Sequence, residues 1–165
     1  MNREESVKLL NQAVGDELQA VHQYMYFHFH LDDQGLKPLA VLFRQTAIEE
    51  MGHIETLAER ILFLKGDVNL VPSGPVERIK DPEAMLAKAR QMEEQSGRDY
   101  NAAAQECSRL MDSASKQIFE QLVLDEERHY DAYDKQLDNI ERFGKSYLAL
   151  QSFSPDGAQG PQGPA

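Results

Sequence analysis

The sequence predicts an all-α fold, a four-helix bundle with a long crossover between its second and third helices and a short fifth helix. Glycine and proline gather between long stretches that nearly lack them. Within these stretches apolar residues recur at steps of three and four, the period of one helix face. One connection, residues 67–80, is much longer than the others. Such a link allows the second and third helices to run parallel.

The first two helices form the first predicted hairpin. We expect a helix over residues 3–31, with Gly15 inside it, followed by a turn at residues 32–35. The second helix begins near Pro38, because proline is favoured in the first turn of a helix. It ends at Gly66.

The third helix follows the polar connection of residues 67–80. Asp81 is the expected N-cap, since its carboxylate can accept a hydrogen bond from a free backbone N–H. Pro82 suits the first helical position, and Glu83 lies near the positive end of the helix dipole. This helix reaches about Met111.

The fourth helix begins after a break at residues 112–113 and continues to Phe143, before a glycine. A short amphipathic segment, residues 145–153, follows. Residues 1–153 are therefore expected to form one domain. Residues 154–165 are rich in glycine, proline and glutamine, which is typical of a disordered tail.

Composition excludes several classes of protein. No stretch approaches the roughly 18 apolar residues that a membrane span needs. The N-terminus carries no signal-type apolar block, and the single cysteine, Cys107, rules out an intrachain disulfide framework. We therefore expect a cytoplasmic protein. The net charge of −11 disfavours nucleic acid and anionic membranes as partners and favours cations.

Each of the four long predicted helices carries one glutamate in the middle of its apolar face, where leucine or valine would be ordinary. In two of the helices a histidine follows three residues later, on the same face. These six residues are Glu17, Glu50, His53, Glu93, Glu126 and His129.

The spacing of these residues repeats along the chain. The interval from Glu17 to Glu50 equals the interval from Glu93 to Glu126. The shift that carries the first pair onto the second also carries His53 onto the second histidine, and we call this relation the internal repeat. The pattern is typical of a duplicated helical hairpin.

Buried glutamates need a partner, because an isolated carboxylate in an apolar core costs many kcal/mol. These apolar faces offer no lysine or arginine. The acids therefore either take up protons, as in a purely structural module, or bind cations. Four carboxylates balance two divalent ions, with one imidazole for each. That combination suits iron or manganese, with zinc as a substitute, and is the established pattern of di-iron carboxylate bundles.

With these motifs in place, the chain resembles the bacterioferritin-type ferritins over residues 1–153. The most specific segments are residues 17–24 (ELQAVHQY), 48–53 (IEEMGH), 59–66 (ERILFLKG) followed by Asn69-Leu70, and 125–129 (DEERH). The resemblance implies that the six residues are the ligands of a ferroxidase centre with two irons per subunit. It implies that Glu50 and Glu126 bridge the irons. The terminal pairs are then Glu17 with His53 and Glu93 with His129.

The resemblance also implies a function. Fe(II) is oxidised by dioxygen or peroxide and stored as a mineral in a hollow homo-oligomeric shell of 24 subunits, with 12 as the alternative. Tyr24 matches a tyrosine that donates a hydrogen bond beside the site. Met51 matches the methionine that binds heme b between two subunits, and its position turns away from the di-iron face.

Several alternatives stay open. A miniferritin-like or rubrerythrin-like peroxide scavenger would use the same di-iron site. Glu94 competes with its neighbour Glu93 as a ligand, although the spacing favours the latter. His28 and His30 are expected on the surface, and Cys107 in the core.

Overall fold

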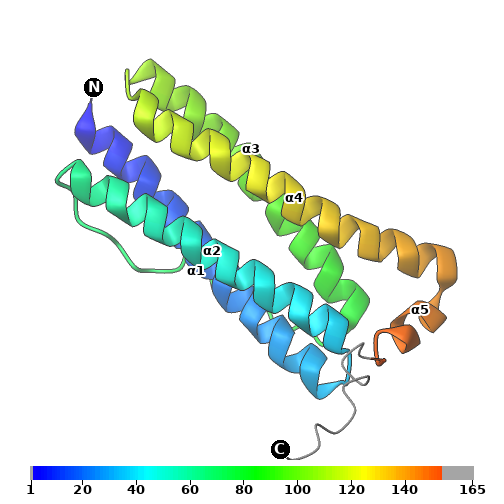
Figure 1. Cartoon of the computed structure of the whole chain (residues 1–165). Helices are drawn as coiled ribbons and strands as arrows, with labels where there is room; N and C mark the ends of the chain where they lie inside the picture. The colour runs from blue at the N-terminus through cyan, green and yellow to red at the C-terminus, as the bar shows by residue number, and fades with distance from the viewer. Residues whose placement is uncertain (1, 154–165) are drawn as a thin grey trace, which may run out of the picture.

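The computed structural model describes residues 2–153 and confirms the predicted bundle (Figure 1). Two helical hairpins lie side by side, α1 with α2 and α3 with α4, and a short helix follows at the end of α4. The expected tail of residues 154–165 lies outside the described part of the chain. The helices are α1 (Arg3–Asp33), α2 (Lys37–Phe63), α3 (Pro82–Arg109), α4 (Ser113–Phe143) and α5 (Lys145–Leu150).

The long connection between α2 and α3 crosses the length of the molecule. In Figure 1 both helices run from the lower right to the upper left, so they are parallel as predicted. Hydrogen bonds fix the connection to α1. The Ser73 N–H donates to the Gly15 carbonyl at 2.9 Å, and the Gln23 amide donates to the Glu77 carbonyl at 2.9 Å and accepts from the Glu77 N–H at 2.7 Å.

Gly15 lies inside α1 because the connection passes directly against it. A Cβ at this position would be 2.7 Å from the Ser73 Oγ and 3.1 Å from the Val71 carbonyl oxygen. The helix therefore accepts the propensity cost of a glycine, about 1 kcal/mol, in return for this close approach.

Three predicted helix ends are wrong by two or three residues. The first helix extends to Asp33, two residues beyond the prediction, and the second ends at Phe63 instead of Gly66. The third ends at Arg109 instead of Met111. In the second and third cases the reversal falls on a non-glycine residue with left-handed backbone, Lys65 (φ 66°) and Met111 (φ 59°).

Gly66 serves a different purpose from the one predicted. Its N–H donates to the Ile61 carbonyl at 3.0 Å, and the Lys65 N–H donates to the Leu62 carbonyl at 3.0 Å, which together close a Schellman cap. A Cβ on Gly66 would lie 2.6 Å from Val7 Cγ1 of α1. The glycine therefore permits close packing of the two helices.

The core consists of two apolar clusters separated by a polar layer. One cluster is built around Tyr24, Phe27, Phe43 and Tyr133, and the other around Leu10, Leu57, Tyr100 and Phe119. The six polar residues singled out in the sequence are buried between them. The apolar clusters on both sides therefore hold the polar layer away from water.

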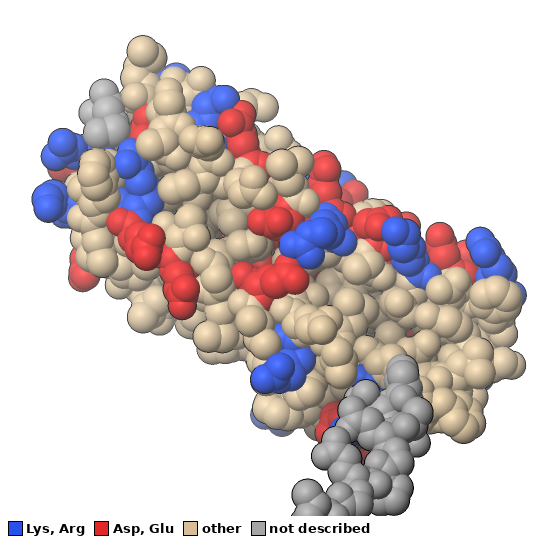
Figure 2. All heavy atoms as spheres, in the orientation of Figure 1, with Lys and Arg blue, Asp and Glu red and all other residues tan. Residues whose placement is uncertain are grey.

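A second buried polar contact ties the hairpins together near one end. The guanidinium of Arg60 on α2 lies 2.6 Å from Asp112, the N-cap of α4, and also donates to Ser115 Oγ at 2.9 Å. The exterior carries interspersed acidic and basic side chains, without a broad basic patch on the face seen in Figure 2. None of the described helices has the length and apolar character that a membrane crossing requires.

Candidate metal centre

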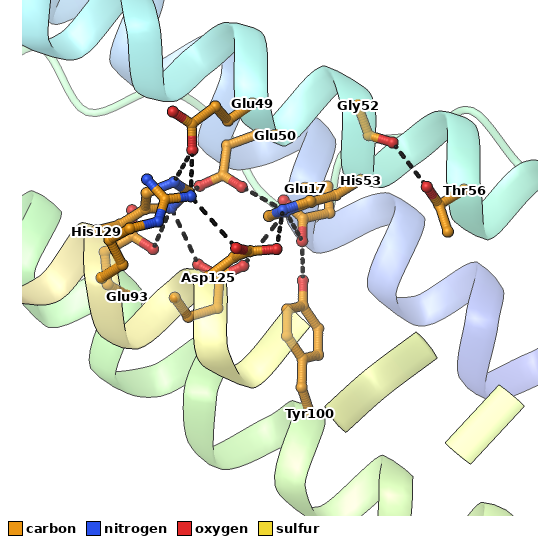
Figure 3. A network of polar contacts seen from close by, with 12 residues as sticks. Glu17, Glu49, Glu50, Gly52, His53, Thr56, Glu93, Tyr100, Asp125 and His129 are labelled. Carbon is orange, nitrogen blue, oxygen red and sulfur yellow. Dashed lines mark hydrogen bonds and ion pairs between the residues drawn. The ribbon is translucent and has the colours of Figure 1, made fainter. Parts of the chain in front are cut away.

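Six side chains from four helices converge at the middle of the bundle, and we call them the carboxylate–histidine cluster. Each is at most 9 % exposed. Figure 3 shows Glu50 reaching down from α2 toward His129 on α4, with Glu17 and His53 beside them. The members are Glu17 from α1, Glu50 and His53 from α2, Glu93 from α3, and Glu126 and His129 from α4.

The cluster divides into two overlapping groups of four potential ligands. Glu17 and His53 complete one group, and Glu93 and His129 complete the other. Glu50 and Glu126 belong to both. Within each group one ligand atom from every residue lies within 4.8 Å of the others. Two such groups that share two carboxylates can hold a pair of metal ions.

Both histidines direct Nδ1 into the cluster. In α2 the three-residue spacing brings His53 Nδ1 to 2.8 Å from Glu50 Oε2, and it also lies 3.3 Å from Glu17 Oε1. His129 Nδ1 lies 3.3 Å from Glu50 Oε1 and 3.5 Å from Glu93 Oε2. The two imidazole rings stack with their centres 6.0 Å apart.

Four atoms of the cluster are buried without a hydrogen-bond partner among the described residues. They are Glu50 Oε2, His53 Nδ1, Glu126 Oε1 and His129 Nδ1. Some of them lie close to one another, but their directions do not form hydrogen bonds. Orphaned polar atoms are costly in a protein interior. Carboxylate oxygens and imidazole nitrogens turned toward a common point suit a metal ion, so the residues fit the predicted pair of irons.

Burial and mutual repulsion change the acidity of the carboxyl groups. Burial raises the pKa of Glu17, Glu93 and Glu126, and the charge of Glu50 raises each of them further. Glu50 behaves differently. Burial acts to raise its pKa as well, but the contacts with His129 and His53 outweigh burial and lower the pKa to about 2.

The imidazoles are more basic than free histidine. Burial acts to lower the pKa of His53, but the contacts with Glu17 and Glu50 outweigh it and raise the pKa to about 11. Burial also acts to lower the pKa of His129, and contacts with Glu126 and Glu50 raise it well above the ordinary value. Without metal, protons therefore balance part of the negative charge of the cluster.

Two buried tyrosines donate hydrogen bonds to the outermost glutamates. Tyr24 Oη donates to Glu93 Oε1, and Tyr100 Oη donates to Glu17 Oε1 at 2.7 Å. Figure 3 shows Tyr100 rising from α3 toward Glu17. Burial raises the pKa of both phenols well above their ordinary value, so both remain donors at neutral pH. Each tyrosine thereby orients one carboxylate toward the centre of the cluster.

Sequence reasoning gave Tyr100 no role, although the signal was present. Tyr24 follows Glu17 at the same interval as Tyr100 follows Glu93. The internal repeat thus relates the tyrosines as well as the glutamates and histidines. Each tyrosine bonds to the glutamate of the opposite hairpin.

Two further acids were missed in the same way. Glu49 Oε2 lies 2.7 Å from His129 Nε2, and Asp125 Oδ2 lies 3.3 Å from His53 Nε2. The internal repeat also carries Glu49 onto Asp125. Arg128 connects them, with Nη2 at 2.6 Å from Glu49 and 3.3 Å from Asp125. This charged layer covers the α2–α4 side of the cluster (Figure 3).

The other residues singled out in the sequence lie outside the cluster. Glu94 is exposed and forms an ion pair with Arg98 at 2.5 Å, so Glu93 is the member of the adjacent pair that reaches the cluster. Met51 is 52 % exposed. Cys107 is buried in the core as expected.

The histidines near the end of α1 are only partly on the surface. His28 Nδ1 lies 2.8 Å from the Ala40 carbonyl oxygen, and His30 contacts the Lys80 ammonium at 2.9 Å. Both rings are half-buried, where the sequence predicted surface positions.

Comparison with known proteins decides the family. Residues 7–143 match the family described as "Ferritin-like domain", a span that runs from α1 to the end of α4. The chain is 37 % identical over 150 residues to the bacterioferritin of Rhodobacter capsulatus, covering 90 % of this chain and 92 % of that one. The chain belongs to the ferritin-like family, among the bacterioferritin-type ferritins.

Other relatives of this ferritin-like chain agree. It is 34 % identical to the bacterioferritin of Brucella melitensis, again over 90 % of this chain and 92 % of the relative. The bacterioferritin of Desulfovibrio desulfuricans is 30 % identical over 90 % of this chain and 83 % of its own length. The resemblance inferred from the sequence motifs is confirmed.

Proposed function

We propose that this protein stores iron, and that it oxidises Fe(II) to Fe(III) at the carboxylate–histidine cluster. The observation that carries the proposal is the sharing of Glu50 and Glu126 between two groups of potential ligands. Two Fe(II) ions bind as substrate, one with Glu17 and His53, the other with Glu93 and His129. The shared carboxylates bridge them, as the resemblance implies.

The chemistry follows from the charge of the site. Two Fe(II) ions supply two electrons, which with two protons reduce one dioxygen to hydrogen peroxide, or one hydrogen peroxide to two waters. Four carboxylates in a site shielded from water favour Fe(III), because the higher charge interacts more strongly with them. Tyr24 and Tyr100 orient the terminal glutamates throughout.

Storage requires an assembly, because one bundle has no cavity for a mineral. The relatives named bacterioferritin favour a homo-oligomeric shell of this chain, of 24 subunits with 12 as the alternative. The mass of the assembled particle distinguishes the two. The cytoplasm, where Fe(II) must be captured, is the proposed location.

We also propose that Met51 binds heme b where two subunits meet. Its thioether is exposed on α2, and Ile48, one turn earlier, is 49 % exposed, so this edge can face a second copy. Heme would supply a redox group at the interface. The expected result is a Soret band in the purified protein that is lost in Met51→Leu, while the particle mass is kept. Full heme content in that variant would exclude Met51 as the ligand.

Fe(II) oxidation tests the central proposal. Metal-free protein receives two Fe(II) per subunit in air, and absorbance in the near ultraviolet is followed. We expect fast oxidation that saturates near two irons per subunit and is lost in Glu50→Ala. Glu94→Gln is the matched control, because Glu94 is exposed and outside the cluster. A wild-type trace as slow as that of Glu50→Ala, with dioxygen and again with peroxide, would contradict the proposal.

A further inference from the structure

A groove between α3 and α4 leads directly to the carboxylate–histidine cluster. Its volume is about 240 Å³, and Glu93 and Glu126 form part of its lining. Glu126 is 1 % exposed, and its Oε1 has no hydrogen-bond partner among the described residues. The groove therefore ends at carboxylates that lack a partner.

The wall of the groove has a gap at Gly97 of α3. A Cβ built on this residue would meet no atom within 4 Å, so open space lies beside the backbone there. Gly97 lies inside a helix and has ordinary helical backbone, so its conformation does not require glycine. A side chain at this position would occupy the groove itself.

The charge along the groove attracts cations. Glu94 and Glu127 lie at the exposed end, and Arg98 neutralises Glu94 through their ion pair. Among the described residues that line the outer part, Glu127 therefore remains as the uncompensated charge, with Glu93 and Glu126 at the inner end. Acids that line a groove with low-dielectric walls raise the local concentration of cations.

The other sides of the cluster are covered. On the α2–α4 side, Arg128 holds Glu49 and Asp125 over the outer nitrogens of the histidines. On the α1–α3 side, a larger groove of about 490 Å³ has Tyr100 in its lining and none of the six cluster residues. Tyr100 closes that side with the hydroxyl that bonds Glu17.

We infer that divalent metal ions reach the cluster through the α3–α4 groove, past Glu127 and Gly97. This inference rests on the proposed function and adds the route by which the substrate arrives. It assigns Gly97 the role of keeping that route open, and Glu127 the role of attracting the ion.

Binding kinetics of Co(II) to the assembled, metal-free protein test the route without oxidation. Visible absorbance reports occupancy in a stopped-flow instrument, and an equilibrium titration gives the stoichiometry. Gly97→Leu is compared with Gly52→Leu, which places the same side chain on α2, where a Cβ also meets no atom within 4 Å. We expect Gly97→Leu to slow binding about tenfold or more at unchanged stoichiometry, because it narrows the approach. Gly52→Leu keeps the wild-type rate.

Glu127→Lys tests the charge independently of packing. The wild-type rate falls as salt is added, and we expect the variant to bind more slowly with a weaker dependence on salt. Wild-type kinetics in both Gly97→Leu and Glu127→Lys would overturn the route. So would slow binding confined to Gly52→Leu, which would place the route on the α2–α4 side. Wild-type protein that binds no Co(II) at equilibrium would instead overturn the proposed function itself.

Discussion

Glu17 illustrates how a charged residue comes to occupy a core position. It is 2 % exposed, and burial together with the charge of Glu50 raises its pKa. Its hydrogen bond from Tyr100 and its contact with His53 satisfy it only in part. Such a residue contributes little to the stability of the metal-free fold, and its value lies in what it binds.

Glu17→Gln separates these two contributions. The amide keeps the shape and removes a charge that opposes Glu50, so we expect a metal-free free energy of unfolding within about 1 kcal/mol of wild type, or higher. Co(II) stoichiometry falls from two to one per subunit. Urea unfolding and equilibrium titration measure the two effects, with Glu94→Gln as the exposed control. A large loss of metal-free stability with two Co(II) still bound would contradict the assignment of Glu17 as a ligand.

The pH dependence of stability follows from the same groups. The raised pKa of His53, about 11, means that its contribution is fully present below the unfolded value of 6.5 and is lost as pH rises through 11. The raised pKa values of Glu17, Glu93 and Glu126 act in the same direction, because the folded state retains their protons above pH 4.5. Glu50, with a lowered pKa, loses its contribution only as pH falls from 4.5 through about 2.

We therefore expect the metal-free protein to become less stable between about pH 6 and about pH 8. The stabilisation by Co(II) changes in the opposite direction, because the metal displaces these protons and binds more tightly as pH rises. Calorimetry with chelator and with Co(II) at the two pH values measures both slopes. A metal-induced rise in Tm that is smaller at the higher pH would contradict this account.

At the residue scale, the sequence contained more of the site than was extracted from it. The apolar faces and the internal repeat were sufficient to select the six cluster residues. The same repeat relates Tyr24 to Tyr100 and Glu49 to Asp125, but neither relation was used. Their contacts cross between hairpins, and a periodicity within one helix does not show which residue of another helix lies opposite.

At the element scale, the connection between α2 and α3 is a packed part of the fold. Asn11 accepts from the Asn69 N–H at 2.8 Å and donates to the Asp67 carbonyl at 2.9 Å, and Gln34 donates to the Lys80 carbonyl at 2.9 Å. These side chains from α1 and its C-terminal end satisfy backbone groups along the connection. The connection in turn determines where α3 begins, and so where Glu93 lies.

Gly15→Leu tests this packing. The side chain would collide with Ser73 and the Val71 carbonyl, so we expect a loss of about 1–3 kcal/mol in the free energy of unfolding. Gly52→Leu, the same change in open space, keeps or slightly raises stability, since glycine is a poor helix former. Urea denaturation measures both. Equal stability of the two variants would show that the connection does not pack against α1 as described.

The helices could be predicted from the sequence, but their ends only in part. The Asp81 cap was found because its side chain and position are a local signal, and it accepts from the Ala84 N–H at 2.9 Å. The ends of α2 and α3 were misplaced because Lys65 and Met111 adopt left-handed backbone, which their residue types do not signal. Gly66 was interpreted as a helix terminator, whereas contact with Val7 explains it.

At the scale of the whole molecule, the fold places a polar layer between two apolar clusters. Each hairpin supplies half of the ligands, and the parallel arrangement of α2 and α3 relates the halves by the internal repeat. The net charge of −11 suits a protein that attracts Fe(II) and repels nucleic acid. The symmetry is incomplete, because Arg128 of α4 corresponds to Gly52 of α2. The covering charged layer therefore comes from one side only.

The central claim is that the cluster binds a pair of metal ions. Crystals soaked anaerobically in Fe(II), with diffraction measured at the iron absorption edge, test it most directly. We predict two anomalous peaks about 3.5–4 Å apart, both in contact with Glu50 and Glu126. One peak adjoins Glu17 and His53, and the other adjoins Glu93 and His129. A single peak, or none among these six side chains, would contradict the account.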